Sequence, residues 1–272
     1  MNTSTRLILF FSATSIACNA GGPIADEYND ASDVPSPSDD IDDIPLDELE
    51  EQDEQRDEEN EENEDGDSTG DAPDPEPTIT YDFDEDNSLI YVQVFKDEDA
   101  WLSGMAHNHV IRASEYTGEV DYNLDSLEDC NISFSFRVMD LQVDESGMRE
   151  FVGYDEPLAS DDRAEIRDNM MDSSQLNAGV YDTISFESTQ CTGDGGAVAE
   201  LVVTGNLRVR GTNAQVAPTV TVTVYEGKLY AQSTFEVRHS SFGMSPYSFL
   251  GGAVRNADPL RFTLDIVANA NN

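Results

Sequence analysis

Three histidines are the residues whose types and spacing could support chemistry in this chain. His107 and His109 lie one residue apart in the stretch GMAHNHVIRA, and His239 lies in FEVRHSSFG. On a β-strand, residues i and i+2 point to the same face, so His107 and His109 could both reach one metal ion. A zinc site would need a third ligand, either His239 or a carboxylate. No serine or cysteine nucleophile motif accompanies the histidines, so we expect no catalytic residues and no enzyme activity.

Two non-metal roles for the paired histidines stay open. His107 and His109 could form hydrogen bonds that shape the end of a strand, or they could contact the polar end of a ligand at the mouth of the fold. Of the three roles, the metal site is the minority alternative, and no metal cofactor is expected. Trp101, the only tryptophan, precedes the same strand. It is expected either to pack against a ligand or to cap the core.

The charge of the chain excludes one class of partner. The formal net charge is −43, with 14 Lys and Arg against 57 Asp and Glu. Nucleic-acid binding needs clustered basic residues, so no nucleic-acid partner is expected. Residues 18–78 hold much of the acidic charge, in runs such as LDELEEQDEQRDEENEENEDGD. Such a segment cannot bury enough apolar surface to fold, and it is predicted to be a disordered acidic tether.

The first residues have the layout of an export signal. Residues 1–17 carry Arg6 and then the short apolar run LILFF, which is too short to span a bilayer. The sequence SIAC resembles a bacterial lipobox, so Cys18 is predicted to be the lipidated N-terminus after cleavage at residue 17. We therefore expect a lipoprotein of the cell envelope, held at the outer membrane by its lipid and facing the periplasm or the exterior.

The two remaining cysteines, Cys130 and Cys191, are expected to form a disulfide, because an exported domain folds in an oxidising compartment. The bond would close a loop of about 60 residues, which the chain-entropy model credits with about 4 kcal/mol. The alternative is two free buried thiols.

Residues 79–272 are predicted to form one domain, in which apolar and polar residues alternate with period two. A hairpin turn is expected at Glu226-Gly227. Residues 160–176 lack this alternation and predict a short helix, because Ser160, Asp161 and Asp162 suit its N-cap and first turn. The fold class is therefore all-β with one short helix, an antiparallel barrel of about eight strands, because closure removes exposed strand edges. The strand segments are LIYVQVF, NISFSFRVM, TISFES, ELVVTGNLRVRG, TVTVTVYEGKLYAQSTFEV and LRFTLDIVA.

Several stretches, in order, resemble the YceI-like family of secreted bacterial proteins with a lipocalin-like barrel. The similarity covers nearly all of residues 85–269. GMAHNHVIRA is similar to the GHxH-type second strand of one branch, and FSFRVMDLQVDESGMREFVG is similar to that branch's strand followed by a Val-Asp turn. The family pattern is also matched by RAEIRDNMMDSSQLNAGVYDTISFES, GNLRVRGTNAQVAPTVTV and EVRHSSFGMSPYSFLGGAVRNADPLRFTLDI. Asp182 replaces the usual proline, and Val209-Arg210-Gly211 replaces the usual Ile-His-Gly.

The resemblance implies a non-catalytic barrel around an elongated apolar cavity that holds a polyisoprenoid chain, such as a quinone tail or an isoprenoid alcohol. The expected partners are an apolar lipid and the membrane, with no cofactor beyond the bound lipid. The same alternation would also suit a solid core that serves as an interaction domain, and this alternative stays open. The candidate ligand-contacting residues are Trp101, His107, His109, Ile132, Phe134, Phe136, Ile184, Phe186, Leu207 and Phe235.

Overall fold

The computed structural model describes residues 77–154 and 156–271. The predicted signal peptide, Cys18 and the tether up to residue 76 lie outside them. None of the described helices is long and apolar enough to cross a bilayer.

The strands are β1 (Ile79–Phe83), β2 (Leu89–Lys96), β3 (His109–Ala113), β4 (Tyr116–Tyr122), β5 (Asn131–Arg137), β6 (Leu141–Val143), β7 (Thr183–Gly193), β8 (Val198–Val209), β9 (Thr212–Val216), β10 (Thr219–Tyr225), β11 (Lys228–Arg238), β12 (Ser248–Phe249) and β13 (Val254–Ala270). The helices are α2 (Ser146–Phe151) and α3 (Ser160–Met171), with 3-10 turns η2 (Glu85–Asn87), η3 (Ser103–Met105), η4 (Val138–Asp140), η5 (His239–Phe242) and η6 (Leu250–Gly252).

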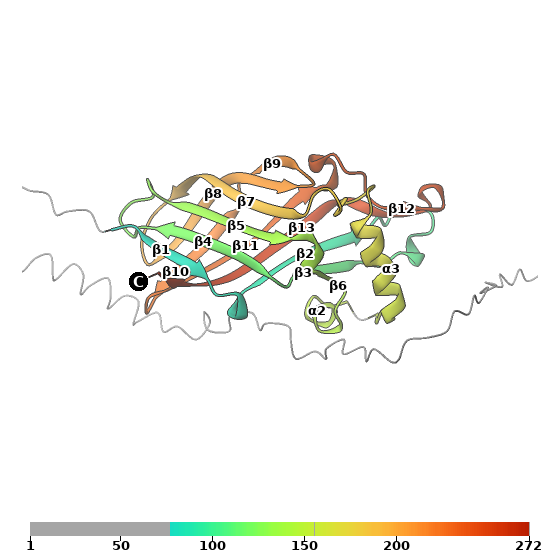
Figure 1. Ribbon diagram of the computed structural model, residues 1–272, viewed down its shortest axis with the longest axis horizontal. Helices are drawn as coiled ribbons and strands as arrows, with labels where there is room; N and C mark the ends of the chain where they lie inside the picture. The colour runs from blue at the N-terminus through green and yellow to red at the C-terminus, as the bar shows by residue number, and fades with distance from the viewer. Residues whose placement is uncertain (1–76, 155, 272) are drawn as a thin grey trace, which may run out of the picture.

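Eight strands close into an antiparallel barrel (Figure 1). Their order is β1-β4-β5-β7-β8-β10-β11-β13, and β1 pairs again with β13 to complete the circle. β13 is 17 residues long. Its last residues pair with β1, and residues 256–265 pair with β2. β2, β3 and β6 therefore prolong the wall beyond β1. The predicted fold class is confirmed.

The hairpin of β10 and β11 turns where the sequence predicts it. Tyr225 and Lys228 are register partners on either side of Glu226 and Gly227. These two residues have φ of 49° and 75°. A two-residue hairpin turn with positive φ at both positions follows the right-handed twist of the strands, and glycine accepts this conformation without strain.

Helix α3 lies where a helix is predicted, but its N-terminus differs from the prediction. Ala159, not Ser160, occupies the N-cap position, and no side chain caps the helix. Ile166, Met170 and Met171 pack against the barrel core, while Ala164 is exposed. The six-residue helix α2 was not predicted. Figure 1 shows both helices at the end of the barrel where β3 and β6 prolong its wall.

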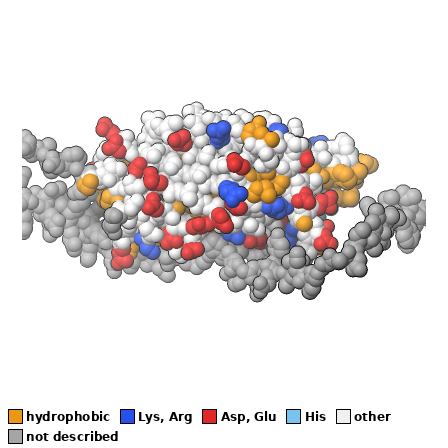
Figure 2. All heavy atoms as spheres, in the orientation of Figure 1, with side chains coloured by type: hydrophobic (Ala, Val, Ile, Leu, Met, Phe, Trp, Pro, Cys, Tyr) orange, Lys and Arg blue, Asp and Glu red, His pale blue; other side chains and the backbone are white. Residues whose placement is uncertain are grey.

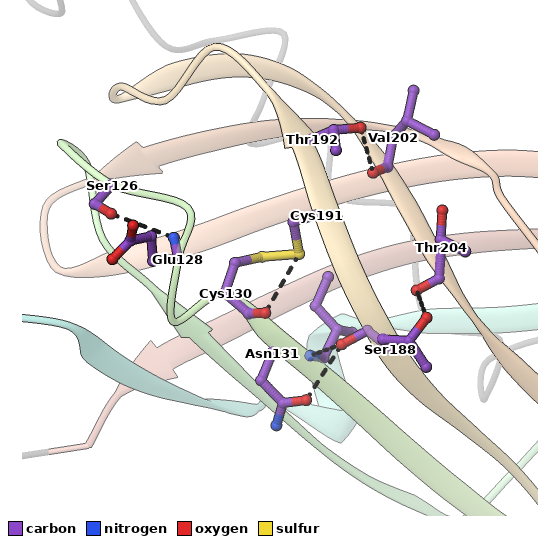
Figure 3. The surroundings of a disulfide bond; sticks show 11 residues. Ser126, Glu128, Cys130, Asn131, Ser188, Cys191, Thr192, Val202 and Thr204 are labelled. Atoms are coloured by element: carbon purple, nitrogen blue, oxygen red, sulfur yellow. Dashed lines mark hydrogen bonds between the residues drawn. A yellow bond between two sulfur atoms is a disulfide. The ribbon is translucent and has the colours of Figure 1, made fainter.

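Cys130 and Cys191 form a disulfide with an S–S distance of 2.04 Å (Figure 3). Cys130 directly precedes β5, and Cys191 lies within β7, which pairs with β5. The bond closes a span of 61 residues that includes α2 and α3. In the chain-entropy model a loop of this length contributes about 4 kcal/mol to stability.

Candidate functional site

The barrel contains two cavities with almost wholly apolar walls. The first, which we call the distal chamber, has a volume of about 60 Å³ and lies within β1, β4, β5, β7, β8, β10, β11 and β13. The second, the helix-side chamber, has a volume of about 100 Å³ and receives Met170 from α3 and Phe242 from η5. Their walls have no residue in common. The interior is thus neither solid nor a single tube.

Five phenylalanine side chains and one leucine lie between the two chambers, and we call this group the partition. On three successive strands, Phe134 pairs with Phe186 and Phe186 pairs with Leu207. The ring centroids of Phe134 and Phe186 are 5.4 Å apart. On the opposite strands, Phe235 of the distal chamber stacks on Phe262 of the helix-side chamber at 5.5 Å. The partition consists of Phe134, Phe136, Phe186, Leu207, Phe235 and Phe262.

A glycine makes room for this packing. A Cβ atom at Gly205 would overlap the ring of Phe186. Gly205 lies two residues before Leu207 on β8 and is buried like it. The absence of a side chain there therefore allows the ring of Phe186 to extend over β8 inside the barrel.

The predicted ligand-contacting residues divide among these features. Ile132, Phe134, Phe186 and Phe235 line the distal chamber. Phe136 and Ile184 line the helix-side chamber. Leu207 is fully buried in the partition and lines neither chamber.

A third cavity, which we call the polar recess, adjoins the helix-side chamber. Its volume is about 120 Å³. It shares five wall residues with the helix-side chamber and adds polar side chains from four separate segments. The shared residues are Val94, Ile111, Met170, Gln175 and His239; the added residues include His109, Asn169, Tyr247 and Asn256.

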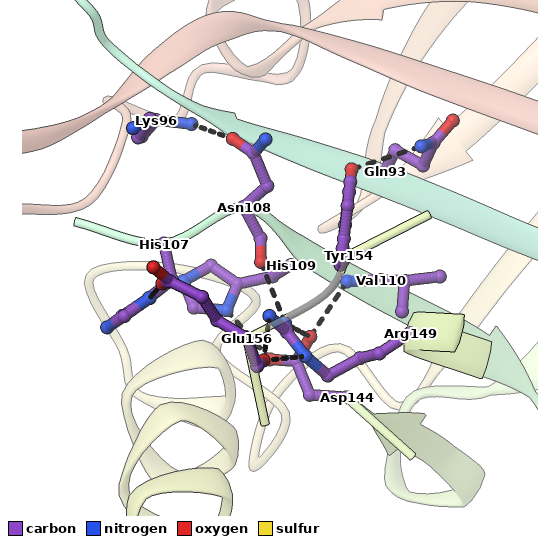
Figure 4. Close-up of polar contacts among 10 residues, drawn as sticks. All are labelled: Gln93, Lys96, His107, Asn108, His109, Val110, Asp144, Arg149, Tyr154 and Glu156. Atoms are coloured by element: carbon purple, nitrogen blue, oxygen red, sulfur yellow. Dashed lines mark hydrogen bonds and ion pairs between the residues drawn. The ribbon is translucent and has the colours of Figure 1, made fainter. Parts of the chain in front are cut away.

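His109, which lines the recess, also belongs to a buried ionic network (Figure 4). Its Nδ1 lies 2.7 Å from Oδ2 of Asp144, whose side chain is fully buried. The other oxygen of Asp144 accepts hydrogen bonds from the backbone N–H of Val110 at 3.0 Å and from Arg149 at 2.8 Å. Arg149 donates further to the backbone oxygens of Asn108 and Glu156. The network joins β3 to the segment containing α2.

The network determines the charge of Asp144. Burial alone would raise the pKa of this carboxyl, but the hydrogen bond and charge of His109, with the hydrogen bonds from Val110 and Arg149, outweigh burial and lower the pKa below its usual value of 3.8. Asp144 therefore carries a negative charge at neutral pH. Its φ is 50°, in the left-handed region that Asp tolerates better than most residues.

His239 reaches the recess from η5, the turn that follows β11. Its Nδ1 donates to the backbone oxygen of Asp258 at 2.9 Å. The side chain is buried, and this burial lowers the pKa of His239 below 6.5, although the hydrogen bond and charge of Asp258 oppose the effect. The ring is therefore neutral at pH 7.

The lowered pKa of His239 predicts that acid weakens the fold. Between 6.5 and the lower pKa of the folded state, the unfolded chain binds more protons, so the free energy of unfolding decreases as pH falls through this window. Urea unfolding of the wild type and of His239→Gln at pH 7.5 and 5.5 measures how much His239 contributes to the pH dependence of the free energy of unfolding. We expect the His239→Gln variant to lose less stability on acidification than the wild type. Equal losses in wild type and His239→Gln would contradict the assignment.

His107 is separated from the other two histidines in its contacts. Its Nδ1 lies 3.2 Å from Glu156 at the surface, its side chain is 39% exposed, and it does not line the recess. Within residues 77–154 and 156–271, no three His, Cys, Asp or Glu side chains are grouped to hold a metal ion. The minority metal site of His107, His109 and His239 therefore lacks its ligand set in the described part of the chain.

Trp101 lies outside both chambers. It is 86% exposed, in a loop that follows β2 and is held to the start of β13 by the hydrogen bond from Leu102 N to Ala253 O. Phe249 and Leu250, which precede β13, are also exposed. Figure 2 shows apolar side chains at the end of the molecule where Figure 1 places β12. The structure thus supports neither a cavity contact nor a core cap for Trp101.

Sequence reasoning missed Asp144, Arg149 and most of the recess. The Val-Asp turn after β6 was visible as a pattern, but nothing local indicated that Asp144 bonds a histidine 35 positions earlier. Asn169, Gln175, Tyr247 and Asn256 converge only through the barrel's closure and the placement of α3. Their types alone gave no signal, because such residues are common on surfaces.

Comparison with known proteins gives a family and a fold. Residues 81–268 match the model of the YceI-like domain. No match was found among curated proteins. The solved structure of BcnA from Burkholderia cenocepacia is 15% identical, with a TM-score of 0.52, over 69% of this chain and 99% of BcnA. At this identity the likeness is one of fold.

Two further solved structures are similar. A polyisoprenoid-binding domain from Saccharophagus degradans is 7% identical, with a TM-score of 0.48, over 71% of this chain and 99% of that one. The YceI protein of Campylobacter jejuni is 11% identical, with a TM-score of 0.45, over 60% of this chain and 85% of that one.

Proposed function

We propose, since this chain belongs to the YceI-like family, that its barrel binds the apolar chain of a lipid and carries out no reaction on it. The observation that carries the proposal is the pair of apolar chambers inside a closed barrel. Moving hydrocarbon from water into such walls contributes roughly 25 cal/mol per Å² of apolar surface buried. Pockets of this kind, with few polar groups, suit ligands recognised by shape and hydrophobicity.

An isoprenoid chain is the ligand class that we propose. Its support is the family resemblance together with the elongated arrangement of two chambers along one barrel. A chain that occupies both chambers must push the side chains of the partition aside. Aromatic side chains can move aside by rotating about χ1 and χ2. A short chain can occupy the helix-side chamber alone.

The test fills each chamber from within. Ala113 lines the helix-side chamber and Ala231 the distal chamber, so Ala113→Leu and Ala231→Leu each add three carbon atoms to a chamber. Binding of the fluorescent hydrocarbon diphenylhexatriene to the delipidated full chain reports occupancy. We expect each variant to weaken binding about tenfold, equivalent to about 1.4 kcal/mol, with the double variant weakest.

Thr221→Leu is the matched control, because Thr221 is exposed on β10. It adds apolar surface outside the barrel and is expected to leave binding unchanged. Circular dichroism and thermal unfolding of each variant confirm that the barrel is retained. Equal binding by the wild type and the folded double variant would overturn the proposal.

We propose in addition that the mature chain is lipidated at Cys18 and held at the outer membrane, with residues 18–78 as a tether. The proposal rests on the SIAC sequence and the acidic composition that follows it. Labelling of cells with a radioactive fatty acid should mark the wild type and leave Cys18→Ala unlabelled. Label on the variant, or none on the wild type, would contradict it.

A further inference from the structure

The polar recess presents hydrogen-bond acceptors beside an apolar chamber. His109 and His239 both line it, and both have Nδ1 engaged, with Asp144 and with the backbone oxygen of Asp258 respectively. A carbonyl oxygen and a carboxylate only accept hydrogen bonds, so each Nδ1 must carry the hydrogen. The ring of His239 is neutral at pH 7, so its Nε2 bears a lone pair and can accept a hydrogen bond.

A second acceptor comes from Gln175. Its amide nitrogen donates to the backbone oxygen of Ser245 at 3.2 Å, which assigns the orientation of the amide and leaves Oε1 as its acceptor. Gln175 lines both the recess and the helix-side chamber. His239 and Gln175 both line the recess and the chamber, where the polar end of a bound chain would lie.

No lysine or arginine is among the described residues that line the recess, and the charge of His109 is balanced by Asp144, 2.7 Å from its Nδ1. The nearest buried guanidinium, that of Arg149, is engaged by Asp144 and by backbone oxygens of Asn108 and Glu156. A phosphate or carboxylate entering the recess would lose its hydration without gaining a positive partner that is not already paired with a carboxylate. Burying such an unpaired charge is strongly unfavourable.

From this geometry we propose that the polar recess binds the uncharged hydroxyl head group of a lipid alcohol whose hydrocarbon chain occupies the helix-side chamber. The hydroxyl donates one hydrogen bond, to Nε2 of His239 or to Oε1 of Gln175, and can accept one from Tyr247, Asn169 or Asn256. This inference rests on the proposed function, because the recess can select a head group only if the barrel holds the chain.

The experiment compares ligands that share one chain and differ at the head. Geranylgeraniol, its methyl ether, its monophosphate and the corresponding hydrocarbon each displace diphenylhexatriene from the delipidated full chain. The alcohol is expected to bind about tenfold more tightly than the ether, since the ether cannot donate a hydrogen bond. The phosphate is expected to bind at least about tenfold more weakly than the alcohol.

Variants assign the preference to the recess. His239→Leu removes one acceptor and should reduce the preference for alcohol over ether several-fold, while His239→Gln, which restores an acceptor, should recover part of it. His107→Leu is the matched control, because His107 lies outside the recess. It should keep the full preference.

The outcomes separate the two proposals. If the hydrocarbon and diphenylhexatriene both fail to bind, the proposed function and this inference fall together. If they bind but alcohol, ether and phosphate bind equally, or the phosphate binds most tightly, the proposed function stands and the inference is overturned. An unchanged preference in folded His239→Leu also overturns it.

Discussion

Replacing Asp144 by alanine is expected to lower the free energy of unfolding by about 3–5 kcal/mol, because it leaves a buried guanidinium without its charged partner. The side chain of Asp144 is fully buried, and that of Arg149 is 5% exposed. The same change removes the acceptor for Val110 N–H and for His109. Urea unfolding should show the loss, and the melting temperature should fall by roughly 6–20 °C.

Two further variants identify the cause. Asp144→Asn keeps the size of the side chain and one acceptor oxygen but removes the charge. Its free energy of unfolding should therefore lie between those of Asp144→Ala and the wild type. Asp168→Ala, at an exposed position of α3, should stay within about 0.5 kcal/mol of wild type. If Asp144→Ala were as stable as Asp168→Ala, the network would have no structural importance.

Replacing Phe186 by alanine is expected to cost about 3–5 kcal/mol of stability and to join the two chambers. Phe186 is 6% exposed and stacks on Phe134 in the partition. Removing its ring leaves a cavity between the chambers, which a bound chain can fill. Longer prenyl chains should therefore gain affinity in the variant relative to shorter ones, and they should restore more of its lost thermal stability.

Phe249→Ala provides the comparison for Phe186→Ala, since Phe249 is 57% exposed outside the barrel. It should change stability by less than about 0.5 kcal/mol and leave the dependence on chain length unaltered. Unfolding curves and displacement of diphenylhexatriene by prenyl alcohols of increasing length measure both effects. A Phe186→Ala variant that is destabilised but has the chain-length dependence of wild type would show that the partition does not limit the ligand.

The regular parts of the barrel could be predicted because their information is local. Alternation in β5, β7 and β8 and the Glu226-Gly227 turn each depend on adjacent residues. β13 begins earlier than predicted. Its first residues, 254–259, mix apolar and polar side chains, include Pro259 and overlap a register shift between Asn256 and Leu260. A proline and an irregular register hide the period-two pattern on which the prediction depended.

The site could be predicted only in its apolar part. Phe134 and Phe186 follow from alternation, because inward positions of a strand are apolar whatever the barrel contains. The division into two chambers does not follow, because it depends on which aromatic rings meet across strands. The meeting of His109 with His239 in one recess required the register of β2, β3, β11 and β13 and the position of η5. The short spacing of His107 and His109 instead drew attention to a pair that the structure separates.

Native mass spectrometry of the full chain, purified without exchange of its lipids, tests the central claim most directly. We expect a complex with one apolar lipid, released as an isoprenoid-type molecule on activation. The mass of this lipid should be lost in the folded Ala113→Leu/Ala231→Leu variant and kept in Thr221→Leu. A wild-type protein that carries no lipid and takes up none when lipid is supplied, or a lipid that remains bound when both chambers are filled, would contradict it.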